Sequence, residues 1–186
     1  LGIETGVNLD RLLEVARGKA TSREVLATAM ALGRKLGKVS VVAGVCDGFI
    51  GNRMLAVRTA QAERLLLAGA DPAAADAALV EFGFPMGHFA MYDLAGLDVG
   101  WRIRKARGVE APVTDVLCEE GHFGQKTGKG YFVYEKGSRV PVPDPHVTEI
   151  AVAQAKALGI ARRTITRQEI VERFTFPMIN EAARII

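Results

Sequence analysis

The sequence predicts a mainly α-helical chain, and its helix-start signals are the clearest reason. Capping boxes stand at Thr21–Glu24 and Thr166–Glu169, and Asp-Pro pairs open further segments at Asp71 and Asp144. In a capping box the hydroxyl and the carboxylate satisfy N–H groups that the first helical turn leaves unpaired, and proline is well tolerated at the first helical position. Apolar residues then recur at helical spacing after each signal. No G-x-G-x-x-G motif follows a strand pattern, so the chain contains no dinucleotide-binding unit of its own.

The elements are expected in the following order. Residues 8–15 form either one or two helical turns or a short strand, and residues 39–42 form a strand, because so short a β-branched run disfavours a helix. Residues 83–87 form a turn, and residues 131–134 are extended. Pro177 should kink the last helix, because proline removes a donor and clashes with the preceding turn. The expected helices cover residues 21–36, 48–68, 72–82, 89–94, 99–105, 113–120, 145–158 and 166–185.

Composition excludes several classes of protein. The chain has 186 residues, 49% of them apolar and 24% charged, which is typical of a globular domain. Its net charge is +3, and acidic residues separate the basic ones, so we expect no nucleic-acid partner. No apolar run reaches the ~18 residues of a membrane span. The three histidines are scattered, with no Cys or carboxylate at ligand spacing, so we expect no metal site. Cys46 and Cys118 sit among apolar residues, which predicts buried free thiols in a reducing compartment.

Two long helical segments share a faint repeat. The stretch from Arg53 to Arg64 matches the stretch from Arg173 to Arg184 at a constant offset of 120 residues. Chance similarity between amphipathic helices explains such a match as well as duplication does. The chain also begins at Leu1 and stops inside a helical pattern, so we interpret it as a fragment of a longer protein.

The stretch from Asp47 to Arg53 (Asp-Gly-Phe-Ile-Gly-Asn-Arg) stands out. Asp47 can cap the following helix, but Gly48 and Gly51 cost its first turns about 1 kcal/mol each against alanine. Either a neighbouring element packs closely there, which this stretch alone favours, or a ligand approaches the bare backbone. Asn52 then places a neutral amide beside that backbone.

Three further stretches contain candidate residues for chemistry. Residues 124–130 look like a phosphate-binding loop, but Gly130 follows the lysine where Ser or Thr should hold magnesium, so we interpret them as a glycine-rich turn with surface lysines. The basic cluster at residues 102–107 is interpreted as solvated. Glu14, an acid among aliphatic residues, is the one carboxylate that we single out for acid–base chemistry.

Taken together, these stretches resemble the C-terminal domain of the L-3-hydroxyacyl-CoA dehydrogenases. The resemblance rests on residues 47–53 and on further matches in the same order at residues 13–22, 82–87, 93–100 and 123–131. Residues 101–105 and 143–145 are similar to the multifunctional β-oxidation enzymes, which join an enoyl-CoA hydratase to this dehydrogenase and carry two copies of the helical domain. The resemblance therefore favours a true repeat at offset 120.

The resemblance implies a fold and a division of the chain. The fold is the helical 3-hydroxyacyl-CoA dehydrogenase C-terminal domain, of the 6-phosphogluconate dehydrogenase C-terminal-like type, with a partial second helical repeat and no Rossmann domain. Residues 1–20 would be the remnant of a junction after an NAD-binding domain, and residues 21–135 the first helical domain. Residues 136–143 would be a linker, and residues 144–186 a truncated second repeat.

The resemblance also implies an activity. The family oxidises a 3-hydroxyacyl-CoA to the 3-ketoacyl-CoA and passes hydride to NAD, which a preceding domain binds. Glu14 would be the catalytic carboxylate that orients a histidine base, Asn52 the substrate-binding amide at the 3-oxygen, and Gly48 and Gly51 would leave room for the thioester. The histidine is expected twelve residues before Glu14, where Gly2 stands, so the chain alone should be inactive.

Partners and location follow from the same resemblance. The expected ligands are a 3-hydroxyacyl-CoA and its 3-ketoacyl-CoA, and the apolar face from Ile170 to Ile185 suits a homodimer or other self-association. A bacterial cytoplasmic location is expected first and a peroxisomal one second. The competing interpretation is a non-catalytic helical association module.

Overall fold

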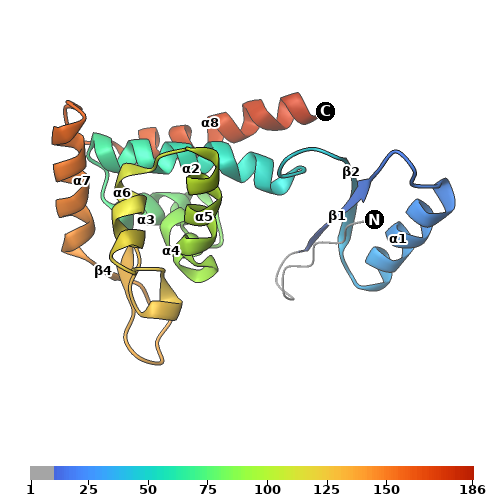
Figure 1. Ribbon diagram of the computed structural model, residues 1–186, viewed down its shortest axis with the longest axis horizontal. Coiled ribbons are helices and arrows are strands. Elements are labelled where there is room, and N and C mark those ends of the chain that lie inside the picture. The colour runs from blue at the N-terminus through green and yellow to red at the C-terminus, as the bar shows by residue number, and fades with distance from the viewer. Residues whose placement is uncertain (1–10) are drawn as a thin grey trace. The chain divides into compact units, whose positions relative to one another are not determined.

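The computed structural model describes residues 11–186, and its internal contacts divide the chain into two units. Unit 1 contains the residues up to Val57 together with Met178–Ile186, and unit 2 contains Arg58–Pro177. Two long helices, α2 (Gly51–Ala68) and α8 (Arg167–Ile185), run through both units (Figure 1). Helix α8 is a single helix through Pro177.

Unit 1 contains a parallel strand–helix–strand element. Strands β1 (Leu12–Arg17) and β2 (Val39–Gly44) pair in parallel, and helix α1 (Arg23–Lys35) connects them. Leu13 and Val15 of β1 are buried against Ala29 of α1. The strand alternative for residues 8–15 is therefore correct over the described part. The expected boundary between residues 20 and 21 falls in the loop between β1 and α1, and α1 packs on the strands of unit 1.

The start of α1 corrects one detail of the capping box. Ser22 is the capping residue, and its hydroxyl accepts a hydrogen bond from the Val25 N–H at 3.2 Å. Thr21, the expected cap, instead accepts a bond from the Gly18 N–H at 3.0 Å and so closes the preceding turn. The prediction was wrong by one residue, because either hydroxyl can bind a nearby N–H and only the local backbone decides which.

Unit 2 is helical, as the sequence predicts. Its helices, besides parts of α2 and α8, are α3 (Pro72–Phe82), α4 (His88–Ala95), α5 (Leu97–Arg107), α6 (Pro112–Glu119) and α7 (Pro145–Ala157). A short helical turn, η1 (Gln125–Thr127), precedes the antiparallel pair of β3 (Phe132–Val133) and β4 (Val142–Pro143), so part of the expected linker pairs with the first helical region. Asp71 and Asp144 cap α3 and α7 as expected.

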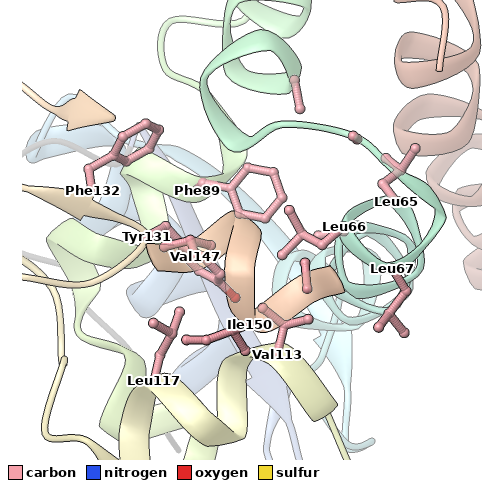
Figure 2. Packing of buried hydrophobic residues seen from close by; sticks show 14 of the residues in the cluster. Leu65, Leu66, Leu67, Phe89, Val113, Leu117, Tyr131, Phe132, Val147 and Ile150 are labelled. Carbon is pink, nitrogen blue, oxygen red and sulfur yellow. The ribbon is translucent and has the colours of Figure 1, made fainter. Parts of the chain in front are cut away.

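One hydrophobic core holds unit 2 together. Figure 2 shows Phe89 of α4 among Leu65 and Leu66 of α2, near side chains from other elements of the unit. Phe89, Leu65 and Leu66 are fully buried, and burying each such side chain contributes about 2 kcal/mol. The same cluster includes Val147 of α7 and Phe174 of α8, so residues beyond 144 share the core of the helices before them.

A buried carboxylate from α3 caps helix α4. The N-cap residue of α4, Gly87, has no side chain to do so. Asp76 accepts hydrogen bonds from the Phe89 N–H at 2.9 Å and the Ala90 N–H at 2.8 Å. Burial raises the pKa of Asp76 to about 6, although these bonds oppose the shift. The position of α4 is therefore fixed by a contact that is distant in sequence.

Helix α6 is held in the same way. Its N-cap residue, Ala111, has no capping side chain, and Glu63 of α2 accepts the Val113 N–H at 2.5 Å and the Thr114 hydroxyl at 2.7 Å. The Thr114 hydroxyl lies 2.5 Å from the hydroxyl of buried Tyr131. Burial raises the pKa of Glu63. A second long-range carboxylate therefore fixes a second helix start.

The glycine-rich turn of residues 124–130 is part of the scaffold. Asp93 of α4, which is buried, accepts the Tyr131 N–H at 2.9 Å, the Phe132 N–H at 3.0 Å and the Tyr134 hydroxyl at 3.0 Å. Lys126 forms an ion pair with Asp98 of α5. The turn therefore docks on α4 and α5, which supports its interpretation as a structural element.

The basic cluster on α5 is paired with acids. The ion pairs are Arg104–Asp115 at 2.7 Å, Lys105–Glu119 at 3.3 Å and Arg102–Asp98 at 3.4 Å. The prediction of a merely solvated cluster was incomplete, because two of these partners lie on α6 and are not apparent from the spacing within α5.

We expect a small, pH-dependent contribution from the start of α7. His146 Nε2 lies 2.8 Å from a Glu120 carboxylate oxygen, and this bond raises the pKa of His146. Because the pKa is higher in the folded than in the unfolded state, the stabilisation is complete below the unfolded pKa and is lost as pH rises through the folded pKa. His146→Gln should therefore lower the free energy of unfolding by about 0.5 kcal/mol at pH 6 and by less at pH 8.5, since the pair is partly exposed. Urea unfolding at both pH values measures this, and equal losses would contradict it.

Candidate substrate-binding turn

The candidate site lies where strand β2 leads into helix α2. The turn between them contains Gly48 at φ 72° and Phe49 at φ 44°, and the Arg53 N–H donates to the Gly48 carbonyl at 2.9 Å. A Cβ at Gly48 would lie 2.8 Å from the Arg53 nitrogen. The backbone of the turn therefore requires glycine at position 48, and this gives Gly48 a structural reason that is independent of any substrate.

The first N–H groups of α2 are bound by a side chain from β1. The helix begins at Gly51, three residues later than expected, and Glu14 Oε1 accepts from the Ile50 N–H at 2.7 Å and the Gly51 N–H at 3.0 Å. A carboxylate at this position interacts favourably with the positive end of the helix dipole. The sequence suggested a local cap, Asp47, for this helix, and it gave no indication of Glu14, which lies 36 residues before Ile50.

The structure thereby brings the two predicted site residues to one turn. Asn52 is exposed on the first turn of α2, next to Gly51, whose N–H is bound by Glu14. A Cβ at Gly51 would meet Glu14 Oε2 at 3.6 Å, which is an ordinary contact. Gly51 is therefore not required by packing in the way that Gly48 is required by the backbone.

The three histidines of the chain belong to the helical unit. His88, His122 and His146 all belong to unit 2, whereas Glu14 belongs to unit 1. His88 is buried among aromatic rings, and burial lowers its pKa well below the usual value, so it remains neutral. Gly2, where the resemblance expects the histidine, lies outside the described residues.

Sequence reasoning missed one neighbour of the turn. Arg53 Nε lies 2.5 Å from Glu181 Oε1 of helix α8. Arg53 ends the stretch that begins at Asp47, but its partner is 128 residues away, and no local pattern connects the two. The prediction that Cys46 is buried was also wrong, because Cys46 lies in the turn after β2 and is exposed. Cys118 is buried, as predicted.

The described residues do not fit an NAD site. The sheet in unit 1 has two strands, and the loop from β1 to α1 contains Gly18 but no glycine-rich fingerprint with which a helix start could bind a pyrophosphate. Among residues 11–186 no group of three or more His, Cys, Asp or Glu side chains could hold a metal ion. Within the same range, no helix has the length and apolarity that crossing a membrane requires.

Comparisons with known proteins give the family to which this chain is similar. Residues 48–134 match the model of the 3-hydroxyacyl-CoA dehydrogenase C-terminal domain. The chain is 46% identical over 195 residues to the peroxisomal bifunctional enzyme of Danio rerio, with 95% of this chain and 27% of that protein covered. It is 33% identical over 192 residues to the fatty acid oxidation complex subunit alpha of Pseudomonas savastanoi, with 97% of this chain and 26% of that protein covered. The chain therefore spans about a quarter of the length of these relatives.

A solved structure is similar over nearly the whole chain. The dehydrogenase part of multifunctional enzyme 1 from C. elegans matches with a TM-score of 0.78 and 29% identity, covering 98% of this chain and 43% of that one.

Proposed function

Because residues 48–134 belong to the C-terminal domain family of the 3-hydroxyacyl-CoA dehydrogenases, we propose that this chain supplies the substrate-binding part of such an enzyme in fatty-acid β-oxidation. The substrate would be a 3-hydroxyacyl-CoA and the product a 3-ketoacyl-CoA. NAD, bound by a domain that precedes this one, would accept the hydride. The chain itself would contribute substrate-binding residues and the packing of its helical repeats.

Chemistry assigns a role to each predicted residue. An alcohol is too weak an acid to ionise at neutral pH, so a base must remove its proton, and histidine suits this because its pKa lies near the working pH. Glu14 would orient that histidine and stabilise the imidazolium. Asn52 would donate to the 3-oxygen and stabilise the charge that develops there.

One observation carries the proposal. Glu14 and Asn52 are far apart in sequence, yet the Glu14 carboxylate binds the N–H groups of Ile50 and Gly51, directly before Asn52. Packing does not require a glycine at position 51, because a Cβ there would make only ordinary contacts. The bare backbone at Gly51 therefore supports the approach of a ligand to this turn.

Asn52→Ala tests the assignment. In a protein that joins this chain to the family's NAD-binding domain and carries Gly2→His to supply the histidine base, we expect kcat/KM for 3-hydroxybutyryl-CoA to fall about 100-fold, because one donor to a developing oxyanion is lost. NADH formation, followed by absorbance, measures this. Asn180→Ala, an exposed asparagine on α8, is the matched control and should leave the rate unchanged. Equal rates for Asn52→Ala and wild type would refute the role, and NADH formation by the chain alone would refute the expected dependence on a preceding domain.

A second candidate function, that of a helical association module, is favoured by α8. Phe176 and Ile179 on this helix are 55% and 60% exposed, whereas Ile170 and Phe174 are buried. The first part of the predicted Ile170–Ile185 face is therefore buried, and the exposed apolar residues of α8 that are available for self-association are instead Phe176 and Ile179.

Self-association through this face is expected to depend on concentration. Ile179→Glu should shift the sedimentation coefficient toward the monomer, because a charge in an apolar contact is costly. Val152→Glu, at a similarly exposed position on α7, should have no such effect. Sedimentation velocity at several concentrations measures this, and a monomer throughout for the wild-type chain would exclude the module.

The compartment is proposed from the same relatives. The relative from Danio rerio is named as a peroxisomal enzyme. The relative named as a fatty acid oxidation complex subunit alpha comes from a bacterium, Pseudomonas savastanoi. We propose a cytoplasmic location in a bacterial host and a peroxisomal one in a eukaryotic host.

A further inference from the structure

We propose that Glu181 of helix α8 is a positioning residue for the substrate-binding turn, acting through Arg53. This inference rests on the proposed function and adds a contribution from the segment beyond residue 144. The contact between Arg53 and Glu181 lies within unit 1. It joins the helix that presents Asn52 to the helix at the other end of the chain.

The first turn of α2 requires external support. Its entry contains one glycine and one phenylalanine in the left-handed region, at Gly48 and Phe49. A non-glycine residue in this region is a strained position that persists only when surrounding contacts hold it. Glu14 supplies one of these contacts through the N–H groups of Ile50 and Gly51.

Arg53 supplies a second contact from a different direction. Adjacent residues on a helix point about 100° apart, so the side chains of Asn52 and Arg53 leave the turn on different sides. Asn52 is exposed, whereas Arg53 is directed to Glu181 Oε1 at 2.5 Å. The Arg53 N–H also closes the turn on the Gly48 carbonyl, and its guanidinium interacts with Cys46 in the same turn.

Glu181 is held in place as an anion. It is 8% exposed, and its second carboxylate oxygen accepts from Arg184 Nη1 at 3.0 Å. The hydrogen bonds from Arg184 and Arg53 lower the pKa of Glu181. A carboxylate with both oxygens bound has little freedom to follow a moving arginine, so it fixes the arginine and the turn behind it.

The arrangement is specific to the first of the two matching helices. Arg173 occupies the position of Arg53 at the offset of 120 residues, but it pairs with Glu169 of its own helix at 3.5 Å. The same residue type therefore makes a local contact in α8 and a long-range contact in α2. Only the long-range contact lies beside an exposed asparagine.

Nuclear magnetic resonance of the full 186-residue chain tests the positioning role. Glu181→Gln keeps the shape of the side chain and removes its charge. We expect the Arg53 N–H to exchange with solvent about tenfold faster than in wild type, because the turn opens more often. A titration with acetoacetyl-CoA, read at the Asn52 side-chain amide, should give a dissociation constant about fivefold weaker. Arg53→Met should have the same effects. The double variant should show no larger changes in exchange rate or dissociation constant than either single variant, because both substitutions remove the same contact between Arg53 and Glu181.

The control and the contrary outcomes separate this proposal from the proposed function. Glu169→Gln removes an ion-paired carboxylate elsewhere on α8 and should change neither measurement. An Arg53 exchange rate that stays within about twofold of wild type in Glu181→Gln would overturn the positioning role. So would additive losses in the double variant. If acetoacetyl-CoA leaves the Asn52 signal of the wild-type chain unmoved, the substrate assignment fails, and the exchange rates still decide whether Glu181 positions the turn.

Discussion

Gly130→Ala is expected to lower the free energy of unfolding by about 3 kcal/mol or more, because a methyl group at this buried position has no room and would displace a hydrogen-bonded carboxylate. A Cβ at Gly130 would lie 2.0 Å from Asp93 Oδ1 and 2.7 Å from the Gly124 Cα. Neither neighbour can yield easily, since Asp93 is itself bonded to Tyr131 and Phe132. Thermal unfolding followed by circular dichroism measures the loss.

The matched control for this substitution is Gly44→Ala. Gly44 is exposed at the end of β2, and a Cβ there meets no atom within 4 Å. The free energy of unfolding should therefore stay the same or rise slightly, because alanine restricts the unfolded chain more than glycine does. If Gly130→Ala were as stable as Gly44→Ala, the docking of the glycine-rich turn on Asp93 would be disproved.

Asp76→Ala is expected to lower the free energy of unfolding by about 3 kcal/mol, because two N–H groups at the start of α4 lose their acceptor. One of these N–H groups, that of Phe89, is buried. Removal of Asp76 also withdraws a negative charge from the neighbourhood of Arg58. That guanidinium is 3% exposed and lies 4.8 Å from the centre of the Phe84 ring. Burial lowers the pKa of Arg58, and Asp76 opposes this shift. Urea unfolding of the variant measures the cost.

Asp71→Ala gives the comparison for Asp76→Ala. Asp71 caps its own helix, accepting the Ala74 N–H at 2.9 Å, and it is exposed. Water can replace its oxygen, so the loss should be about 1 kcal/mol. If both substitutions lowered the free energy of unfolding by the same amount, the buried cap from a distant residue would stabilise the protein no more than the exposed local cap does.

Much of the fold could be predicted from the sequence because helix starts are local. The Asp-Pro pair at Asp71 places a cap and a proline within two residues of the helix it opens, and the structure confirms α3 within a residue of the prediction. The choice between Thr21 and Ser22 was missed, since both hydroxyls lie within reach of free N–H groups. Residues 8–15 stayed ambiguous, because only pairing with β2 decides that Leu12–Arg17 is a strand.

The residues of the candidate site remain a prediction from the resemblance, whereas their contacts are given by the structure. Glu14 and Asn52 could be named from a resemblance, but nothing in their spacing indicates that Glu14 binds the N–H groups before Asn52. The long-range contact of Arg53 with Glu181 had no signal in the sequence at all. Contacts between residues more than a hundred positions apart depend on how the helices pack, and periodicity describes each helix alone.

The caps that α4 and α6 receive from Asp76 and Glu63 have a consequence for the order of folding. A short helix is marginal in water by itself, because nucleation fixes several residues for the first hydrogen bond. The N-cap residues Gly87 and Ala111 offer these two helices no local help. We therefore expect α4 to become stable only once α3 supplies Asp76, and α6 only once α2 supplies Glu63. Secondary and tertiary structure in unit 2 should then form in one cooperative step. In that step the long-range contacts of Asp76 and Glu63, and not local helix propensity, stabilise α4 and α6.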